Sequence, residues 1–116
     1  TNPVERAQKL HDRGRYAEAL KQLEPFTHPQ SVDSKALYYA GRCQFELGNA
    51  PAAIPLLDRV IKLGEPAFYE GALWFKANAL IQKGDTTRAM LVLDQLLPLR
   101  GAYQRKARQL RDQLSR

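Results

Sequence analysis

Few side chains of this sequence belong to the types that catalyse reactions or hold metal ions. The candidates are two histidines, one cysteine and three serines: His11, His28, Cys43, Ser31, Ser34 and Ser115. Neither histidine has an acidic or cysteine residue at a metal-ligand spacing, and the chain contains no phosphate-binding glycine loop and no known nucleophile motif. We therefore expect no catalytic residue, metal site, cofactor, small-molecule substrate or enzyme activity. The histidines should lie at the surface or in a groove, and Cys43 should be buried and unreactive.

Positive charge is concentrated near the C-terminal end of the sequence. The net charge is +6, and from residue 100 onward six cations stand against Asp112 alone. These cations are Arg100, Arg105, Lys106, Arg108, Arg111 and Arg116. A basic terminal helix can bind nucleic acid or an anionic membrane surface, and it can equally be the solvated cap of a fold. We favour the cap and keep docking on nucleic acid or membrane as the alternative.

Length and composition indicate one globular domain. The 116 residues are 44% hydrophobic and 26% charged, and a chain of this length can bury a core without disulfides or metals. The single cysteine excludes an internal disulfide. The sequence has no apolar run long enough to span a membrane and no signal peptide. It starts at Thr1 rather than Met, so it is compatible with being part of a longer protein.

A pattern of small residues recurs at spacings of 34 and 36 residues. Each copy has a glycine, an alanine five residues later and a leucine four residues after that: Gly14, Ala19 and Leu23; Gly48, Ala53 and Leu57; Gly84, Ala89 and Leu93. Another small residue stands seven residues before each glycine, at Ala7, Gly41 and Ala77. Apolar residues recur at helical spacing on both sides of each glycine. Each unit is therefore predicted to be two closely packed helices joined by a tight turn.

These elements amount to seven predicted helices and no strand. The expected ranges are 3–13, 16–24, 33–47, 50–63, 67–83, 86–97 and 102–114. Asn2 and Asp85 are expected to cap helix starts, as is either Ser31 or Asp33. Pro25 should end the second helix early. Pro55 should bend the fourth helix, because a proline inside a helix removes a backbone hydrogen bond.

The units resemble the tetratricopeptide repeat, a family built from helix-turn-helix units of about 34 residues. The resemblance rests on the residues above and on a further apolar residue in each unit, at Phe26, Val60 and Leu96, and it covers residues 1 to about 100. It implies an all-α, right-handed solenoid in a single domain, 1–116, with units at about 1–33, 34–67 and 68–99. Residues 101–116 resemble the first helix of a fourth unit and are expected to cap the solenoid with a polar outer side.

The resemblance also implies a binding surface, since the first helix of every unit in the family lines a concave groove. Carried onto this sequence, it assigns nine residues to that groove: Gln8, Lys35, Tyr38, Arg42, Phe45, Trp74, Asn78, Arg108 and Arg111. An asparagine there can hydrogen-bond a peptide backbone, and Arg42 and Arg108 can each bind a carboxylate. Trp74 can provide an apolar contact. The alternative is that the aromatic residues pack against neighbouring helices and the arginines only keep the surface soluble.

We therefore predict a non-catalytic protein-interaction module that binds an extended peptide segment of a protein partner. The guest is expected to carry acidic groups or a C-terminal carboxylate. The alternatives are docking of the basic C-terminal helix on nucleic acid or an anionic membrane, and self-association into a homodimer or larger homo-oligomer. The resemblance extends in general appearance to repeat domains of bacterial envelope proteins. The compartment stays open between the bacterial cytoplasm and the periplasm, and the chain is compatible with being the soluble part of a longer membrane-anchored protein.

Overall fold

The computed structural model describes residues 2–116, and over that range the protein has seven α-helices, two 3-10 helices and no strand. The elements in chain order are α1 (Pro3–Asp12), α2 (Tyr16–Leu23), η1 (Glu24–Phe26), α3 (Ser34–Glu46), α4 (Ala50–Leu63), α5 (Pro66–Gln82), α6 (Thr86–Leu96), η2 (Leu97–Leu99) and α7 (Gln104–Leu114). The all-α prediction is confirmed, and every helix end lies within two residues of its predicted place. Thr1, the first residue of the predicted first unit, lies outside the described residues.

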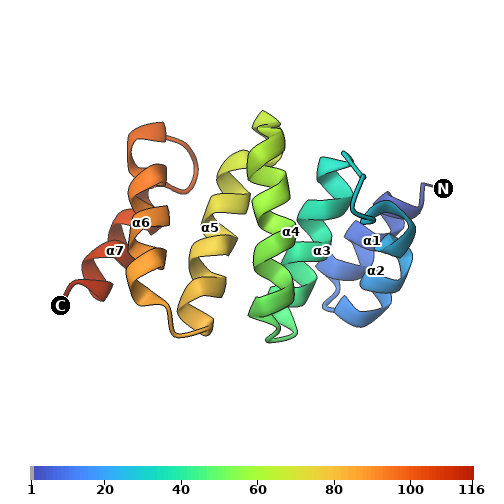
Figure 1. Cartoon of the computed structure of the whole chain (residues 1–116), viewed down its shortest axis with the longest axis horizontal. Coiled ribbons are helices and arrows are strands. Elements are labelled where there is room, and N and C mark those ends of the chain that lie inside the picture. The colour runs from blue at the N-terminus through green and yellow to red at the C-terminus, as the bar shows by residue number, and fades with distance from the viewer. Residues whose placement is uncertain (1) are drawn as a thin grey trace.

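The helices stand side by side in a row, with the two ends of the chain at opposite ends of the row (Figure 1). The body measures 45 × 26 × 26 Å. Each helix packs on the next one along the chain, and α3 also packs on α1 and α5. Figure 1 shows α2, α4 and α6 on the viewer's side of the row. The family resemblance assigns the other layer, α1, α3, α5 and α7, to the inner surface of the solenoid.

The three repeated glycines form the turns between paired helices. Gly14, Gly48 and Gly84 have φ angles of 77°, 78° and 91°, which is the left-handed region that glycine enters without a steric penalty. In each turn the amide after the glycine donates to a carbonyl five residues back; in the third turn Asp85 N lies 2.8 Å from Leu80 O. This bond satisfies a carbonyl that the helix end would leave unpaired, so the same closing geometry recurs in all three units.

The repeated small residues lie where helices touch. Ala19, Ala53 and Ala89 are fully buried, as are Ala7 and Ala77. Their burial confirms that small side chains allow the paired helices to approach closely. At Gly41 even a methyl group would be too large, because an added Cβ would lie 2.7 Å from Leu57 Cδ2.

Side-chain caps and prolines set where several helices begin and end. Asp33, not Ser31, caps α3, accepting a hydrogen bond from Ala36 N at 3.0 Å. Pro25 ends α2 at Leu23 as expected, and the chain continues as the short helix η1. Pro55 lies inside α4, which continues through it from Ala50 to Leu63. Because Pro55 has no N–H, the carbonyl of Pro51 lacks its usual helical hydrogen bond. Pro51 is exposed, so water can bind that carbonyl and the helix tolerates the loss.

Candidate functional site

The candidate site is the inner surface that the family resemblance assigns to α1, α3, α5 and α7. Along α3 the predicted residues Lys35, Tyr38, Arg42 and Phe45 recur at intervals of three or four, so they share one helix face. On α5 the same spacing aligns Trp74 with Asn78. The repeat therefore gives α3 and α5, two successive inner helices, aromatic and polar side chains at equivalent positions.

Arg42 forms the centre of this surface. Its guanidinium carbon lies 4.4 Å from the centre of the Phe75 ring, and the rings of Tyr38 and Tyr39 are 5.5 and 5.7 Å away. Cation–π attraction therefore holds the side chain in place. Within residues 2–116 the buried Nε atom of Arg42 has no hydrogen-bond partner. The site therefore holds a half-buried cation positioned by aromatic rings, with its Nε donor buried and unpaired.

Tyr38 lies beneath the surface. It is 6% exposed and packs against the rings of Tyr39 and Phe68, each at 5.3 Å, and of Phe75 at 6.2 Å. Burial raises the pKa of its hydroxyl well above the usual value, and the nearby Arg42 cation opposes that shift. Tyr38 therefore supports Arg42 and leaves little surface of its own for a guest.

Trp74 and Asn78 are both half-buried on α5. The Trp74 indole stacks on the ring of Tyr103, just before α7, with centres 5.8 Å apart and planes 27° from parallel. Asn78 Nδ2 donates to the Trp74 carbonyl oxygen at 2.9 Å. One face of the indole and one amide hydrogen are thus already used, while the Asn78 carbonyl oxygen keeps its acceptor capacity.

The remaining predicted residues are spread over a wider area. Phe45 is half-buried, 6.0 Å from the Phe75 ring, and its backbone oxygen accepts from Gln82 Nε2 at 3.2 Å. Gln8 on α1 is half-buried and Arg108 on α7 is exposed. Arg111 donates from Nε to Asp94 of α6 at 2.9 Å, so this cation is engaged with the neighbouring helix.

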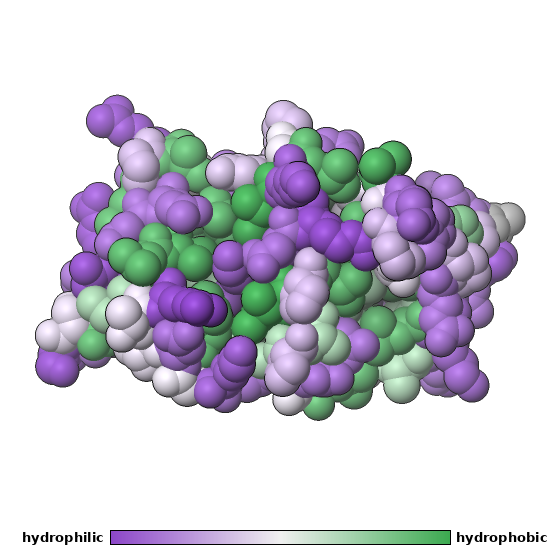
Figure 2. Space-filling model, in the orientation of Figure 1, coloured by the Kyte–Doolittle hydropathy of each residue, from purple (hydrophilic) through white to green (hydrophobic). Residues whose placement is uncertain are grey.

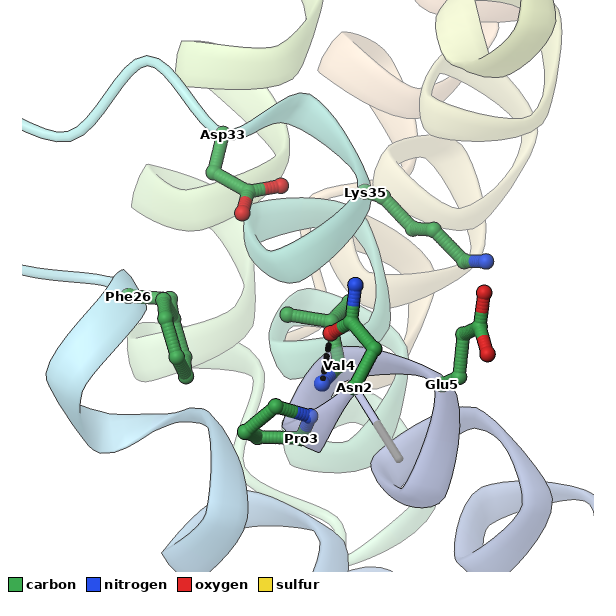
Figure 3. A pocket seen from close by; sticks show the side chains of 7 residues that line it. All are labelled: Asn2, Pro3, Val4, Glu5, Phe26, Asp33 and Lys35. Carbon is green, nitrogen blue, oxygen red and sulfur yellow. Dashed lines mark hydrogen bonds between the residues drawn. The ribbon is translucent and has the colours of Figure 1, made fainter.

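Lys35 borders a hollow of about 380 Å³ between the starts of α1 and α3 and the short helix η1. Its other lining residues are Asn2, Pro3, Val4, Glu5, Phe26 and Asp33. In Figure 3 the ammonium group of Lys35 and the carboxylate of Glu5 point toward one another, while Asn2 caps α1 through Val4 N. The hollow has an apolar wall and charges of both signs at its rim.

Cys43 and His11, two of the side chains able to act in catalysis or metal binding, do not form a common site. Cys43 is fully buried, and burial raises the pKa of its thiol to about 12, as expected of an unreactive cysteine. The expectation that His11 lies at the surface or in a groove is wrong: it is 6% exposed. The rings of Tyr16 and Tyr39 cover it edge-on at 5.4 and 5.3 Å. Among the described residues no three histidine, cysteine or acidic side chains are grouped to hold a metal ion.

Sequence reasoning missed the aromatic residues that position Arg42. The rings of Phe75 and Tyr39 lie 4.4 and 5.7 Å from the Arg42 guanidinium carbon, although neither residue was assigned to the site. A signal existed, because the aromatic pairs Tyr38–Tyr39 and Trp74–Phe75 recur 36 residues apart. That spacing equals the repeat and marks the second member of each pair as structurally equivalent.

A family model described as tetratricopeptide repeat matches residues 4–68, from α1 into the first turn of α5. No curated protein matches this chain. Between residues 2 and 116, none of the helices combines the length and the apolar character that crossing a membrane requires.

Proposed function

Because this chain belongs to the tetratricopeptide repeat family, we propose that it binds an extended peptide segment of a partner protein along its inner surface. Repeats of this family generally mediate protein–protein interaction and typically serve as non-catalytic scaffolds. The proposal for this chain is likewise non-catalytic. The inner helices supply fixed side chains, and the partner supplies the segment that lies across them.

The observation that carries the proposal is the state of Arg42. A guanidinium group stacked on Phe75 has already lost much of its rotational freedom, so binding a guest costs less entropy. Its Nε is buried and has no acceptor within residues 2–116, so a guest carboxylate would meet the terminal Nη nitrogens of this half-buried side chain. Both features favour a charged guest over an apolar one.

The chemistry of the guest follows from the groups that can reach it. Arg42 can bind a carboxylate through two parallel N–H donors. Asn78 can accept a hydrogen bond from a peptide N–H through its free carbonyl oxygen, one helix along. An extended segment with an acidic side chain or a C-terminal carboxylate satisfies both groups. Arg108, exposed on α7, is a further cation for a longer guest.

A peptide array tests this proposal if each peptide is present twice, once with a free C-terminal carboxylate and once with an amidated C-terminus. The strongest binder would then be titrated by calorimetry against the protein and its variants. Arg42→Glu should weaken binding about tenfold to a hundredfold, because it removes a charge-assisted bond of about 1.5–3 kcal/mol. Arg42→Lys should fall between, since lysine keeps the charge and loses the two-pronged geometry. Asn78→Ala should weaken binding less than Arg42→Glu.

Lys62→Glu provides the matched control. Lys62 is exposed in the last turn of α4 and lies outside the predicted groove. Lys62→Glu replaces a cation by a carboxylate, so it changes the net charge by the same amount as Arg42→Glu. It should leave the affinity almost unchanged. Unaltered affinity in both Arg42→Glu and Asn78→Ala would show that the peptide does not bind at the inner surface.

A second candidate is the exposed basic face of α7 together with Arg116, two residues beyond the end of this helix. Arg105, Lys106 and Arg108 are exposed on the helix and Arg116 lies beyond it, whereas Arg111 is paired with Asp94. Binding to nucleic acid or an anionic vesicle through this face should weaken steeply as salt is added. Charge reversal at Arg105, Lys106 and Arg108 should abolish that binding, while Arg42→Glu should hardly change it.

A further inference from the structure

The outer face of α6 exposes a large apolar side chain at its centre. We define this α6 face by Thr87, Arg88, Leu91, Asp94 and Gln95, all of which are exposed. Leu91 is 61% exposed, more than any other large apolar side chain on the helices of residues 2–116. Its neighbours along the chain, Val92 and Leu93, are buried in the core between α5, α6 and α7.

A hollow of about 360 Å³ lies directly beside Leu91, between α4 and α6 and above α5. Ile54, Leu80, Leu91 and Val92 provide its apolar walls. Figure 2 shows hydrophobic surface gathered in this region between α4 and α6. Of the three charged residues on the wall, Asp58 and Lys76 are paired with each other at 2.7 Å, and Arg88 lies 3.5 Å from Asp85. An apolar side chain of a partner therefore fits the hollow better than a charged one.

The polar residues of the α6 face are arranged symmetrically about Leu91. Arg88 stands three residues before it and Asp94 three residues after it, with Thr87 and Gln95 at four residues on either side. If a second α6 crossed the first obliquely at Leu91 about a two-fold axis, so that the rows of residues 88, 91 and 94 aligned, Arg88 of each copy would face Asp94 of the other. The α6 face thus carries opposite charges at two positions that would contact each other across a two-fold axis, as a self-complementary interface requires.

We propose that the α6 face is a docking surface for a second copy of this chain. In the dimer, Leu91 of each copy packs at the edge of the other's hollow, and Arg88 pairs with Asp94 of the second copy on both sides of the two-fold axis. Asp94 already accepts from Arg111 within its own chain, and Arg88 lies 3.5 Å from Asp85 of its own chain, so the contact between Arg88 and Asp94 joins two existing ion pairs into a four-membered charge network. The surface lies on α6, in the layer that faces the viewer of Figure 1, and the proposal does not depend on the peptide groove.

Sedimentation equilibrium of the full chain across a range of concentrations tests this dimer. The unsubstituted protein should show a monomer–dimer equilibrium, and Leu91→Glu should be monomeric throughout. Arg88→Glu alone and Asp94→Arg alone should each raise the dimer dissociation constant by about tenfold or more, because each places like charges opposite one another twice. The double variant Arg88→Glu with Asp94→Arg restores opposite charges and should recover dimerisation.

Leu47→Glu is the matched control, because Leu47 is also exposed, at 49%, but lies at the end of α3. It should dimerise as the unsubstituted chain does. Circular dichroism should show the same helix content in every variant. A chain that stays monomeric at all concentrations would overturn the proposal. So would a dimer that survives Leu91→Glu, one that Leu47→Glu disrupts equally, or a double variant that folds but stays monomeric.

Discussion

Cys43 shows how strongly a single buried position can change a side chain's chemistry. Burial raises the pKa of its thiol from 9.0 to about 12, while the neighbouring Arg42 cation acts in the opposite direction. At neutral and mildly alkaline pH the fraction of reactive thiolate should therefore be about a thousandfold lower than for an ordinary cysteine. A thiol reagent should label the native protein only at the rate at which it unfolds. Rapid labelling without unfolding would show that the thiol is accessible.

The same shift gives stability a pH dependence whose sign is fixed. An acid whose pKa is raised in the folded state stabilises that state fully below its unfolded value, here 9.0, and loses the contribution as pH rises toward 12. Burial of Tyr38 acts in the same direction. The free energy of unfolding should therefore fall with increasing pH above about 9. Chemical denaturation at a series of alkaline pH values would measure this slope, and a Cys43→Ala variant should reduce it.

At the scale of the helices, the turn glycines control how each pair is joined. Gly84 has a φ of 91° and an added Cβ would meet no atom within 4 Å, so the cost of Gly84→Ala is purely conformational. It should lower the free energy of unfolding by about 1–2 kcal/mol, because left-handed backbone disfavours a Cβ. Gly84→Asn should cost less, since asparagine tolerates this conformation. Urea denaturation compares the two, and equal loss in both would indicate a steric cause instead.

At the scale of the whole molecule, α7 protects the end of the row of helices. Ala107 is fully buried against the core between α5 and α6, and Tyr103, Leu110 and Leu114 pack beside it. Removing residues 101–116 should uncover this apolar surface and lower the free energy of unfolding by about 3–6 kcal/mol. Urea denaturation would measure the loss, and an apolar dye should bind the shortened chain.

Hydrogen exchange would show where the loss of α7 is felt. Each unit of a solenoid contacts mainly its neighbours, so protection should fall most in α5 and α6 and least in α1 and α2. Gln109→Ala, on the exposed side of α7, is a control that should change neither stability nor exchange. Uniform loss of protection along the chain would show that all units unfold together, so that coupling is not limited to adjacent units.

The sequence by itself determined the helices and their pairing. These features depend on local chemistry, since a glycine tolerates left-handed backbone, an aspartate caps a helix start and apolar residues recur along one helix face. The periodic small residues added a tertiary constraint that is visible in sequence, because Ala19, Ala53 and Ala89 could only recur in that way if helices touch there. Helix ends were therefore predicted to within two residues.

Only the tertiary structure decided what each inner side chain does. Tyr38 and Arg42 stand on one helix face in sequence, yet rings from α5 cover the first, with Phe68 at 5.3 Å and Phe75 at 6.2 Å, and Phe75 orients the second. Arg111 is engaged by Asp94, seventeen residues away, and His11 is enclosed by rings from two other helices. Such contacts depend on the distance and angle between helices. Those quantities are set by packing among many side chains at once, so no single stretch of sequence specifies them.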